Sequence, residues 1–360
     1  MKILHFAAEN YARVPGTMVR AERRLGHESV LMTLFPSSQA TRDEDVCLRL
    51  PFAGRKRYLP FLKRHLLQER RSDSCRRKKA GTNPPVWDVP NGFVSFLFLV
   101  RDRLWEGRIR RALRWMGIDT FDVIFLDGGL GFLRSGKIAQ ELKKQEKKIV
   151  VGYYGGDLRS RGIIPHVDAL ADYRFTVEFD HTILYPELEY IFAPFEWSAV
   201  PKSVHREDGI VRVGHAPTNR RIKGTDAILD QLFRLKELHP IEIVLMENLP
   251  YEEALALKGS CDLFVDTLGE LGYGMSGLEA LSMGIPTAVQ LLPDYEKILG
   301  DHPFINVSEQ TLVERLIPFV ESEALRKEFG EKGKTWVRMT HDPLKVVGKI
   351  MERIAEAPSS

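Results

Sequence analysis

The sequence is poor in cysteine and has no long hydrophobic run. Its 3 cysteines are odd in number and widely scattered, at Cys47, Cys75 and Cys261. This spacing fits neither a disulfide framework nor a cysteine-ligated zinc site, and it favours a reducing, cytoplasmic location. The apolar stretch from Phe93 to Val100 covers 8 residues. A bilayer needs roughly 20, so no transmembrane helix is expected. The opening segment MKILHFAAEN meets a glutamate too early for a signal-peptide core, which predicts a protein that is not exported.

No low-complexity tract or internal repeat is present, and 44% hydrophobic with 28% charged residues is a globular composition. A length of 360 residues favours two domains. The net charge of +3 conceals an asymmetry, because residues 1–200 carry 33 lysines and arginines against 24 acidic residues, whereas residues 201–360 carry 19 against 25. The basic half is therefore expected to face an anionic partner, such as a membrane surface or a phosphorylated acceptor.

Strand-like and helical patterns alternate along most of the chain, which predicts the α/β class with two Rossmann-like doubly wound domains. In the first domain, residues 1–195, we expect strands at 2–7, 122–126, 149–153 and 174–177, and helices at 18–25 and 138–147. A loop is expected to carry Pro15 and Gly16. Residues 54–90 interrupt the alternation of strands and helices. They contain 11 lysines and arginines and are interpreted as a basic insertion. A proline-rich linker is predicted at 190–204.

The second domain, residues 205–338, repeats the alternation. Strands are expected at 211–216, 242–246, 261–267 and 287–290, and helices at 225–238, 252–259, 276–284, 312–320 and 325–334. Residues 343–356 have the spacing of a final amphipathic helix.

The first group of residues with chemical potential is HAPTNRRIKGTD, from His215 to Asp226, between a predicted strand and helix. Open α/β sheets bind ligands at the carboxyl ends of their strands, and a helix N-terminus offers amides to an anion. Three cations in this loop, Arg220, Arg221 and Lys223, suit a diphosphate. The alternative is that both arginines are solvated and that Thr225 only caps a helix.

The second group is GYGMSGLEALSMGIP, from Gly272 to Pro286, again between a strand and a helix. Residues 272–277 match the dinucleotide fingerprint G-x-G-x-x-G, but that fingerprint follows its strand directly and this one does not. Ser276 and Glu279 have the spacing of a capping box, which is one interpretation of Glu279. The other is that Glu279 accepts both hydroxyls of a ribose whose phosphates lie on the helix N-terminus.

Found in this order in one doubly wound domain, the two motifs resemble the donor domain of glycosyltransferase family 4, whose members have the GT-B fold. The resemblance implies two domains facing a cleft, a C-terminal helix at about 340–360 that packs back on the first domain, and no cofactor or metal. Arg220 and Lys223 would be catalytic, stabilising the departing nucleoside diphosphate. Other donor contacts would come from Arg221, Gly274, Met275, Ser276, Gly277, Glu279 and Gly16.

The first domain fits the same family more loosely, through the Pro15-Gly16 loop, residues 25–28 and the segment GGDLR at 155–159. In that arrangement Asp157 and Arg159 would bind the acceptor. One departure stands out, because the family carries a sugar-contacting glutamate eight residues before the ribose-binding one, where this chain has Leu271. Either Glu270 substitutes through a bulge, or backbone groups of residues 272–275 hold the sugar.

Three further features have competing interpretations. Asp43-Glu44-Asp45 matches the D-x-D of metal-dependent transferases but lacks a flanking strand, which favours a solvated turn. Residues 55–79 interleave cations with apolar side chains, typical of either a helix on anionic lipid or a solvated loop, and no nucleic-acid-binding motif accompanies them. His5, His27 and His166 are open between a cleft position and a structural role.

The expected function is a retaining, metal-independent glycosyltransferase. It would use a nucleoside diphosphate sugar and a saccharide or lipid-linked acceptor held by residues 1–195. The setting would be cell-surface glycan or glycolipid assembly, in the cytoplasm or on the inner face of the membrane. The alternatives are a nucleotide-binding protein without transferase activity, suggested by Leu271, and an NAD-dependent oxidoreductase, suggested by residues 272–277 alone.

Overall fold

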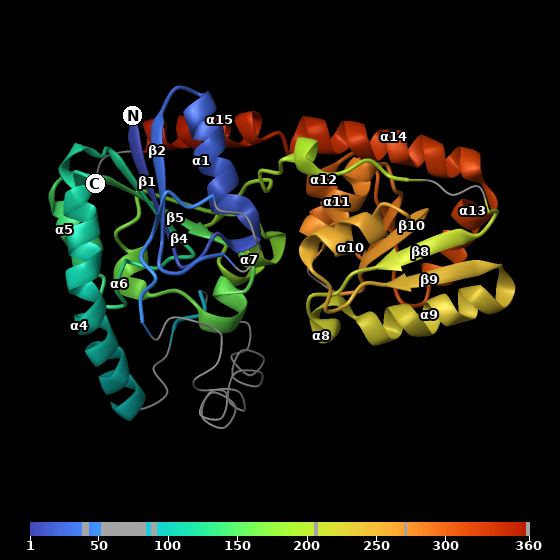
Figure 1. Cartoon of the computed structure of the whole chain (residues 1–360), viewed down its shortest axis with the longest axis horizontal. Helices are drawn as coiled ribbons and strands as arrows, with labels where there is room; N and C mark the ends of the chain where they lie inside the picture. The colour runs from blue at the N-terminus through green and yellow to red at the C-terminus, as the bar shows by residue number, and fades with distance from the viewer. Residues whose placement is uncertain (38–42, 52–83, 88–91, 205–207, 270–271, 358–360) are drawn as a thin grey trace. The chain divides into compact units, whose positions relative to one another are not determined.

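The computed structural model describes residues 1–37, 43–51, 84–87, 92–204, 208–269 and 272–357. The chain divides into two compact units, Met1–Pro194 with Pro343–Ser360, and Phe195–Asp342 (Figure 1). Each unit contains one parallel sheet covered by helices. The α/β class predicted from the alternating pattern is therefore confirmed. Most of the predicted basic insertion, residues 54–90, lies outside the described residues.

The first unit is built on a seven-stranded sheet in the order β3-β2-β1-β4-β5-β6-β7, with all strands parallel. The middle strands are buried along nearly their whole length, as expected when helices cover both faces of a sheet. The chain order reverses between β1 and β4, which is a topological switch point. The strands are β1 (Lys2–Ala7), β2 (Glu28–Thr33), β3 (Val46–Cys47), β4 (Val123–Asp127), β5 (Lys148–Tyr153), β6 (Tyr173–Thr176) and β7 (Glu189–Tyr190).

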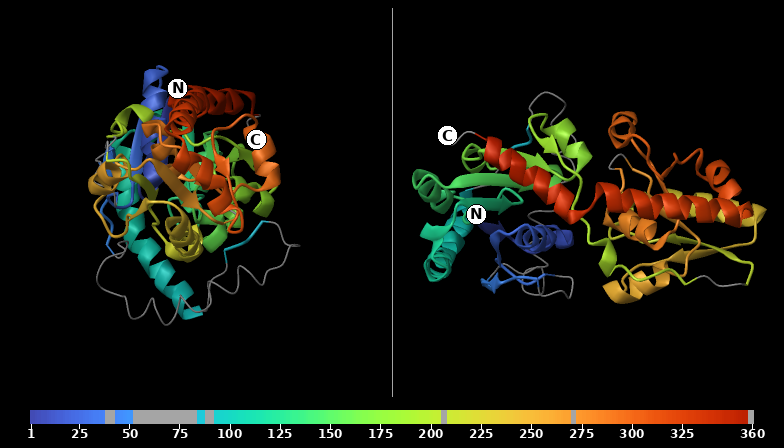
Figure 2. Two further views of the ribbon diagram at one scale, coloured as in Figure 1. Left: turned by 90° about the vertical axis from the view of Figure 1, so that its right-hand side faces the viewer. Right: turned by 90° about the horizontal axis from the view of Figure 1, so that it is seen from above.

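Helices α1 (Val14–Arg24) and α15 (Pro343–Glu356) lie together on the first sheet (Figure 2). Val346, Val347 and Ile350 of α15 share an apolar cluster with Val14 and Met18 of α1. The last helix of the chain therefore belongs to the core of the first unit. Among the described residues, the other α-helices of this unit are α4 (Gly92–Trp115), α5 (Lys137–Lys144), α6 (Pro165–Asp168) and α7 (Phe179–Leu184).

The predicted start of the first helix in this unit was wrong. The first helix begins at Val14 and not at residue 18, because Pro15 occupies the first turn, where its missing N–H costs nothing. Pro15 and Gly16 are therefore helical. Strand β2 and the 24-residue helix α4 were not predicted from the sequence. The spacing of Trp105, Ile109 and Leu113, all buried, is the helical signal that marks the inner face of α4.

The second unit is built on a five-stranded parallel sheet in the order β12-β11-β10-β8-β9. Its strands are β8 (Val211–His215), β9 (Ile241–Leu245), β10 (Leu263–Thr267), β11 (Thr287–Val289) and β12 (Ile305–Asn306). Its helices are α8 (Arg220–Lys223), α9 (Thr225–Leu238), α10 (Tyr251–Lys258), α11 (Met275–Met283), α12 (Pro293–Leu299), α13 (Leu312–Glu321) and α14 (Glu323–Thr340). The predicted bounds of α9 and α15 match those observed.

Candidate functional site

The two motifs of the second unit meet at a buried carboxylate. Lys223 Nζ donates to Asp266 Oδ1 at 2.5 Å, and the Gly274 amide donates to Asp266 Oδ2 at 2.7 Å. The Asp266 side chain is inaccessible, whereas that of Lys223 is 16% exposed. Asp266 therefore joins a cation from the first motif to the glycine loop of the second, at the carboxyl end of β10. Asp266 falls within the strand predicted at 261–267, and no role was predicted for its side chain.

Charge balance keeps this carboxylate ionised. Burial raises the pKa of Asp266, but the charge of Lys223 and the hydrogen bonds from Lys223 and Gly274 outweigh burial and hold the pKa below its usual value. Small residues are needed beside it. A Cβ on Gly277 would lie 3.0 Å from Asp266 Oδ2, and one on Gly274 would lie 3.3 Å from Lys223 Nζ.

The backbone around Lys223 is held by the end of β10. The Leu268 amide donates to the Lys223 carbonyl at 3.0 Å, and Asn219 caps α8 by accepting from the Ile222 amide. Gly224 then reverses the chain into α9 with φ +67°, in the left-handed region that glycine favours. A Cβ at Gly224 would fall 2.2 Å from the Leu268 carbonyl oxygen. The Asn219 cap before Lys223 and the Gly224 turn after it therefore fix the backbone of Lys223.

His215, at the end of β8, is buried and links β8 to β10 and α9 by hydrogen bonds. Its Nδ1 lies 2.8 Å from the Val265 carbonyl, and its Nε2 lies 2.9 Å from the Thr225 hydroxyl. Burial lowers the pKa of His215, so the ring is neutral, with Nδ1 donating to the carbonyl and Nε2 accepting from Thr225. Thr225 therefore bonds to His215, whereas the helix-cap interpretation of its side chain finds no support, since the N-cap of α9 is Gly224.

Helix α11 begins at Met275 with Gly274 as its N-cap, so the predicted capping box was wrong. Ser276 lies inside the first turn because the N-cap is Gly274, two residues before the position that a capping box would require. The Gly277 amide donates to the Gly274 carbonyl at 3.0 Å. Within the described residues, the amides of Met275 and Ser276 have no hydrogen-bond partner, as is usual for the first turn of a helix. These two amides point out of the helix end and are open to a further acceptor.

Glu279, one turn into α11, is held by two residues that the sequence analysis missed. Lys258 Nζ donates to Glu279 Oε2 at 2.5 Å and to Ser276 Oγ at 2.7 Å, and the Tyr251 hydroxyl donates to Glu279 Oε1 at 2.8 Å. Lys258 is only 2% exposed and Glu279 8%. Both partners come from α10, whose sequence carries no motif, so only the packing of α10 against α11 identifies them. Each Glu279 oxygen keeps one lone pair for a further donor.

The two arginines of the first motif lie on the surface. Arg220 pairs with Asp226 at 2.7 Å and with Glu247 at 2.8 Å, and Arg221 is exposed. Glu270 and Leu271, at the sugar-contacting position, lie outside the described residues.

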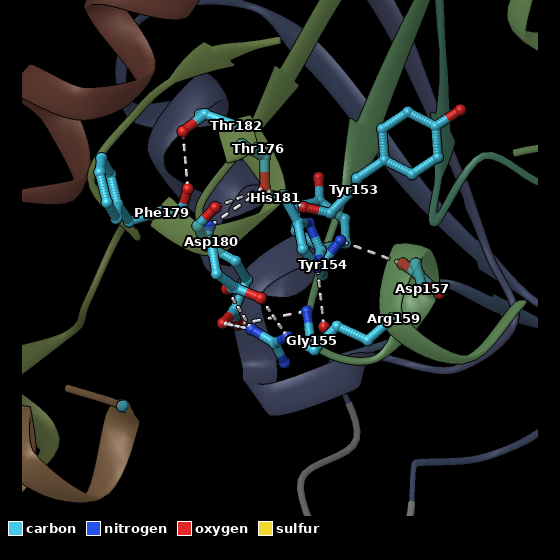
Figure 3. Close-up of polar contacts among 12 residues, drawn as sticks. Tyr153, Tyr154, Gly155, Asp157, Arg159, Thr176, Phe179, Asp180, His181 and Thr182 are labelled. Carbon is cyan, nitrogen blue, oxygen red and sulfur yellow. Dashed lines mark hydrogen bonds and ion pairs between the residues drawn. The ribbon is translucent and has the colours of Figure 1, made fainter. Parts of the chain in front are cut away.

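The predicted acceptor residues lie at the carboxyl ends of β5 and β6 in the first unit. Figure 3 shows Arg159 and His181 near Gly155, whose carbonyl oxygen lies 3.0 Å from His181 Nε2. Arg159 makes ion pairs with Asp180 at 2.6 Å and Glu178 at 2.5 Å. Its guanidinium is therefore already neutralised by two carboxylates.

Asp157 lies in the same cluster at the start of a helical turn, Asp157–Arg161. Its Oδ2 accepts from the Tyr154 amide at 3.0 Å, and the Arg161 guanidinium is 3.8 Å away. Burial nevertheless raises the pKa of Asp157 to about 6. Asp157 is thus the carboxyl group of this edge that changes charge near neutral pH.

His5 forms a buried ionic network. Its Nδ1 donates to Asp127 at 2.9 Å and its Nε2 to Glu22 at 3.0 Å. Burial lowers the pKa of His5, but the two carboxylates outweigh it and raise the pKa to about 10. Tyr154 adds a donor to the other Asp127 oxygen at 2.6 Å. His5 therefore has a structural role between β1, α1 and β4. His27 and His166 contact the N-terminal amine and the Arg134 carbonyl respectively.

Gly16 and the Asp43-Glu44-Asp45 segment are both held within the first unit. The Gly16 amide donates to Asn10 Oδ1 at 2.9 Å, and a Cβ at Gly16 would lie 2.7 Å from Asn10 Nδ2. Asp43 pairs with Arg20 at 2.9 Å, and Asp45 pairs with Arg23 at 2.6 Å. In the described ranges no three histidine, cysteine or acidic side chains are grouped to hold a metal ion.

No family model and no curated protein matches the sequence. Solved structures do match it. Sucrose-phosphate synthase from Thermosynechococcus elongatus is 12% identical, with a TM-score of 0.61 over 99% of this chain and 100% of that one. HepE from Anabaena, solved with UDP, is 12% identical, with a TM-score of 0.56 over 99% and 100% of the two chains. A protein from Listeria monocytogenes described as a UDP-N-acetylglucosamine 2-epimerase is 9% identical, with a TM-score of 0.54 over 99% and 96%.

The protein therefore has the GT-B glycosyltransferase fold, as the resemblance in the sequence implied. The fold includes proteins with different reactions, so the particular chemistry depends on the side chains described above. In the part of the chain that the structure describes, no helix is both long and apolar enough to cross a membrane.

Proposed function

We propose that the protein is a glycosyltransferase that moves a sugar from a nucleoside diphosphate sugar to an acceptor. The observation that carries this proposal is the convergence of Lys223 and the α11 N-terminus on Asp266. A diphosphate bound there would accept hydrogen bonds from the amides of Met275 and Ser276 and from the ammonium of Lys223, with the helix dipole adding to the attraction. Glu279 lies one turn further along α11, where it would accept the ribose hydroxyls.

Catalysis would depend on stabilising the leaving group. As the bond to the sugar breaks, negative charge grows on the diphosphate, and a fixed cation lowers the energy of that state. Asp266 fixes Lys223 and leaves two of its three ammonium protons to donate. Arg220 would assist, with Arg221 as an outer contact. Because side-chain cations supply the charge, the reaction would need no metal, and we propose that the sugar keeps its anomeric configuration.

The acceptor would lie against the first unit, near Asp157 and Arg159. A carboxyl group with a pKa of about 6 is suited to accept hydrogen bonds from sugar hydroxyls at neutral pH. Gly16 would contribute only through its backbone, and its amide would first have to leave Asn10. A saccharide or lipid-linked acceptor in glycan assembly, in the cytoplasm or on the inner face of the membrane, fits this proposal.

The first experiment is a thermal shift with UDP, GDP, ADP and NAD, followed by a turnover assay with the sugar form of the nucleotide that binds. UDP comes first because HepE, which shares the fold, was solved with UDP and with UDP-glucose. We expect Glu279→Gln to weaken binding and Lys223→Met to abolish turnover, with Lys236→Gln on the exposed side of α9 as the control. Normal turnover in both variants would refute the proposal.

Three other outcomes would support other functions. Nucleotide binding without transfer or hydrolysis would favour a binding protein, the alternative that Leu271 suggests. A melting shift with NAD alone would favour an oxidoreductase, although β10 ends at Thr267 and α11 begins only at Met275, unlike a dinucleotide fingerprint. Conversion of a nucleotide sugar to its epimer without any acceptor would indicate an epimerase.

A further inference from the structure

Helix α4 combines a buried face with a wide exposed one. Trp105, Ile109 and Leu113 are buried in the core of the first unit, and Asp102 accepts from the Arg134 amide at 3.0 Å. The helix has 24 residues and is therefore about 36 Å long. Its N-terminal half runs beyond the neighbouring helices α5 and α6 (Figure 1). The exposed face thus continues past the layer that covers the sheet.

The N-terminal part of this exposed face is apolar. Four large side chains within two turns are open to solvent, namely Phe96 (58%), Leu97 (43%), Leu99 (64%) and Val100 (43%). Leu104 continues the group at 55%. A contiguous apolar group of this kind is unusual on a monomeric protein and marks a surface that binds something.

The rest of the face carries positive charge and a tryptophan. Its exposed charged residues are all arginines, at Arg103, Arg108, Arg111 and Arg114. None of them makes an ion pair with another described residue, because the acidic residues of α4 pair elsewhere, Asp102 with Arg101 and Glu106 with Arg110. Trp115, at the end of the helix, is 79% exposed. At 100° per residue these positions share one half of the helix surface with Phe96, Val100 and Leu104.

We infer that the exposed face of α4 lies on a bilayer surface that contains anionic phospholipids. A helix of this composition lies in the interface with its apolar side chains among the acyl chains, and its arginines contact the lipid phosphates. Tryptophan prefers the same headgroup level. The positive charge favours an anionic bilayer over a second copy of this chain, because two arginine-rich faces would repel each other. The residues of α4 follow the basic insertion, residues 54–90, in the sequence and are not part of it.

The experiment measures co-sedimentation of the full chain with vesicles of phosphatidylcholine alone and of phosphatidylcholine with phosphatidylglycerol. Wild-type protein should sediment with the anionic vesicles, and high salt should release it. Arg108→Gln with Arg111→Gln should weaken partitioning by about 25-fold, at about fivefold for each arginine. Phe96→Ser with Leu99→Ser should weaken it by at least about tenfold.

Matched controls come from α9, which exposes similar side chains. Phe233 and Leu238 are 56% and 63% exposed, so Phe233→Ser with Leu238→Ser should leave vesicle binding unchanged. Arg234→Gln with Lys236→Gln is the charge control. The emission of Trp115, obtained by subtracting the Trp115→Phe variant, should shift to the blue on anionic vesicles.

Three results would overturn the inference. Equal binding to both kinds of vesicle would show that anionic lipid is not required. If the α4 variants bind vesicles like wild type, the exposed face of α4 is not the binding surface. A wild-type dimer in sedimentation velocity that Phe96→Ser with Leu99→Ser makes monomeric would identify a second copy as the occupant. All substitutions are at exposed positions, so unchanged melting temperatures should accompany every variant.

Discussion

Replacing Lys223 by methionine tests the link between the two motifs. Methionine keeps most of the side-chain volume but removes the charge that compensates Asp266, whose side chain is fully buried. Removing one partner of a buried pair costs about 3–5 kcal/mol, because the other charge stays buried without compensation. At about 2–4 °C per kcal/mol for a unit of this size, the second unit should melt about 6–20 °C lower.

The assay is differential scanning calorimetry, because a chain of two units need not unfold in a single step. Arg221→Met is the control, since Arg221 is a neighbouring cation on the surface and its loss should leave the transition unchanged. The pH dependence of stability shows whether the charge of Asp266 stabilises or destabilises the fold. In the wild type the low pKa of Asp266 contributes stability that is present above the ordinary carboxyl pKa and is lost as pH falls through the folded value.

In Lys223→Met the pKa of Asp266 should instead rise, so the variant loses stability as pH increases from about 4, and its deficit should be larger at about pH 8 than at about pH 5. Adding Asp266→Asn removes the buried charge and should recover most of the lost melting temperature. Binding of the nucleoside diphosphate should not recover, because the cation is still missing. A melting temperature for Lys223→Met within the range of Arg221→Met would refute the charge-compensation reasoning, and full nucleotide binding by the double variant would refute the phosphate role of Lys223.

Two further predictions concern buried charges that carry no sequence motif. Lys258→Met should weaken nucleoside diphosphate binding by about tenfold or more in isothermal titration calorimetry, because a charged hydrogen bond that orients Glu279 is worth about 1.5–3 kcal/mol; an unchanged dissociation constant would show that Lys258 serves only the fold. The imidazole of His5 should keep the nitrogen chemical shifts of a doubly protonated ring at about pH 8, because its pKa is about 10. Since that pKa lies above its unfolded value, the stability from His5 is complete below about pH 6.5 and falls by about 1.4 kcal/mol per pH unit above it. Neutral-ring shifts at about pH 8 would contradict this assignment.

The alternating pattern determined the fold class and most element positions. Apolar runs such as residues 211–216 predict buried strands, and the 3.6-residue period of residues 225–238 predicts the helix between them, because both signals are local. The order of the two motifs also indicated which edge of the second sheet would bind a ligand. Local signals were wrong at two helix starts: Pro15 lies in the first turn of a helix and not in a loop, and Ser276 lies within a helix and does not cap it.

Only the tertiary structure decided which side chains meet. Lys223 and Asp266 are 43 positions apart in sequence, and their contact follows from the pairing of β8 with β10 and from the reversal of the chain at Gly224. Lys258 could not be recognised from its helix because its role depends on α11 lying beside α10. The sequence by itself determined the periodicity that builds two parallel sheets and the residue types at the strand ends. The structure determined the charge pairing, because burial and long-range contact, which set the energy of each ionised group, are properties of the folded chain.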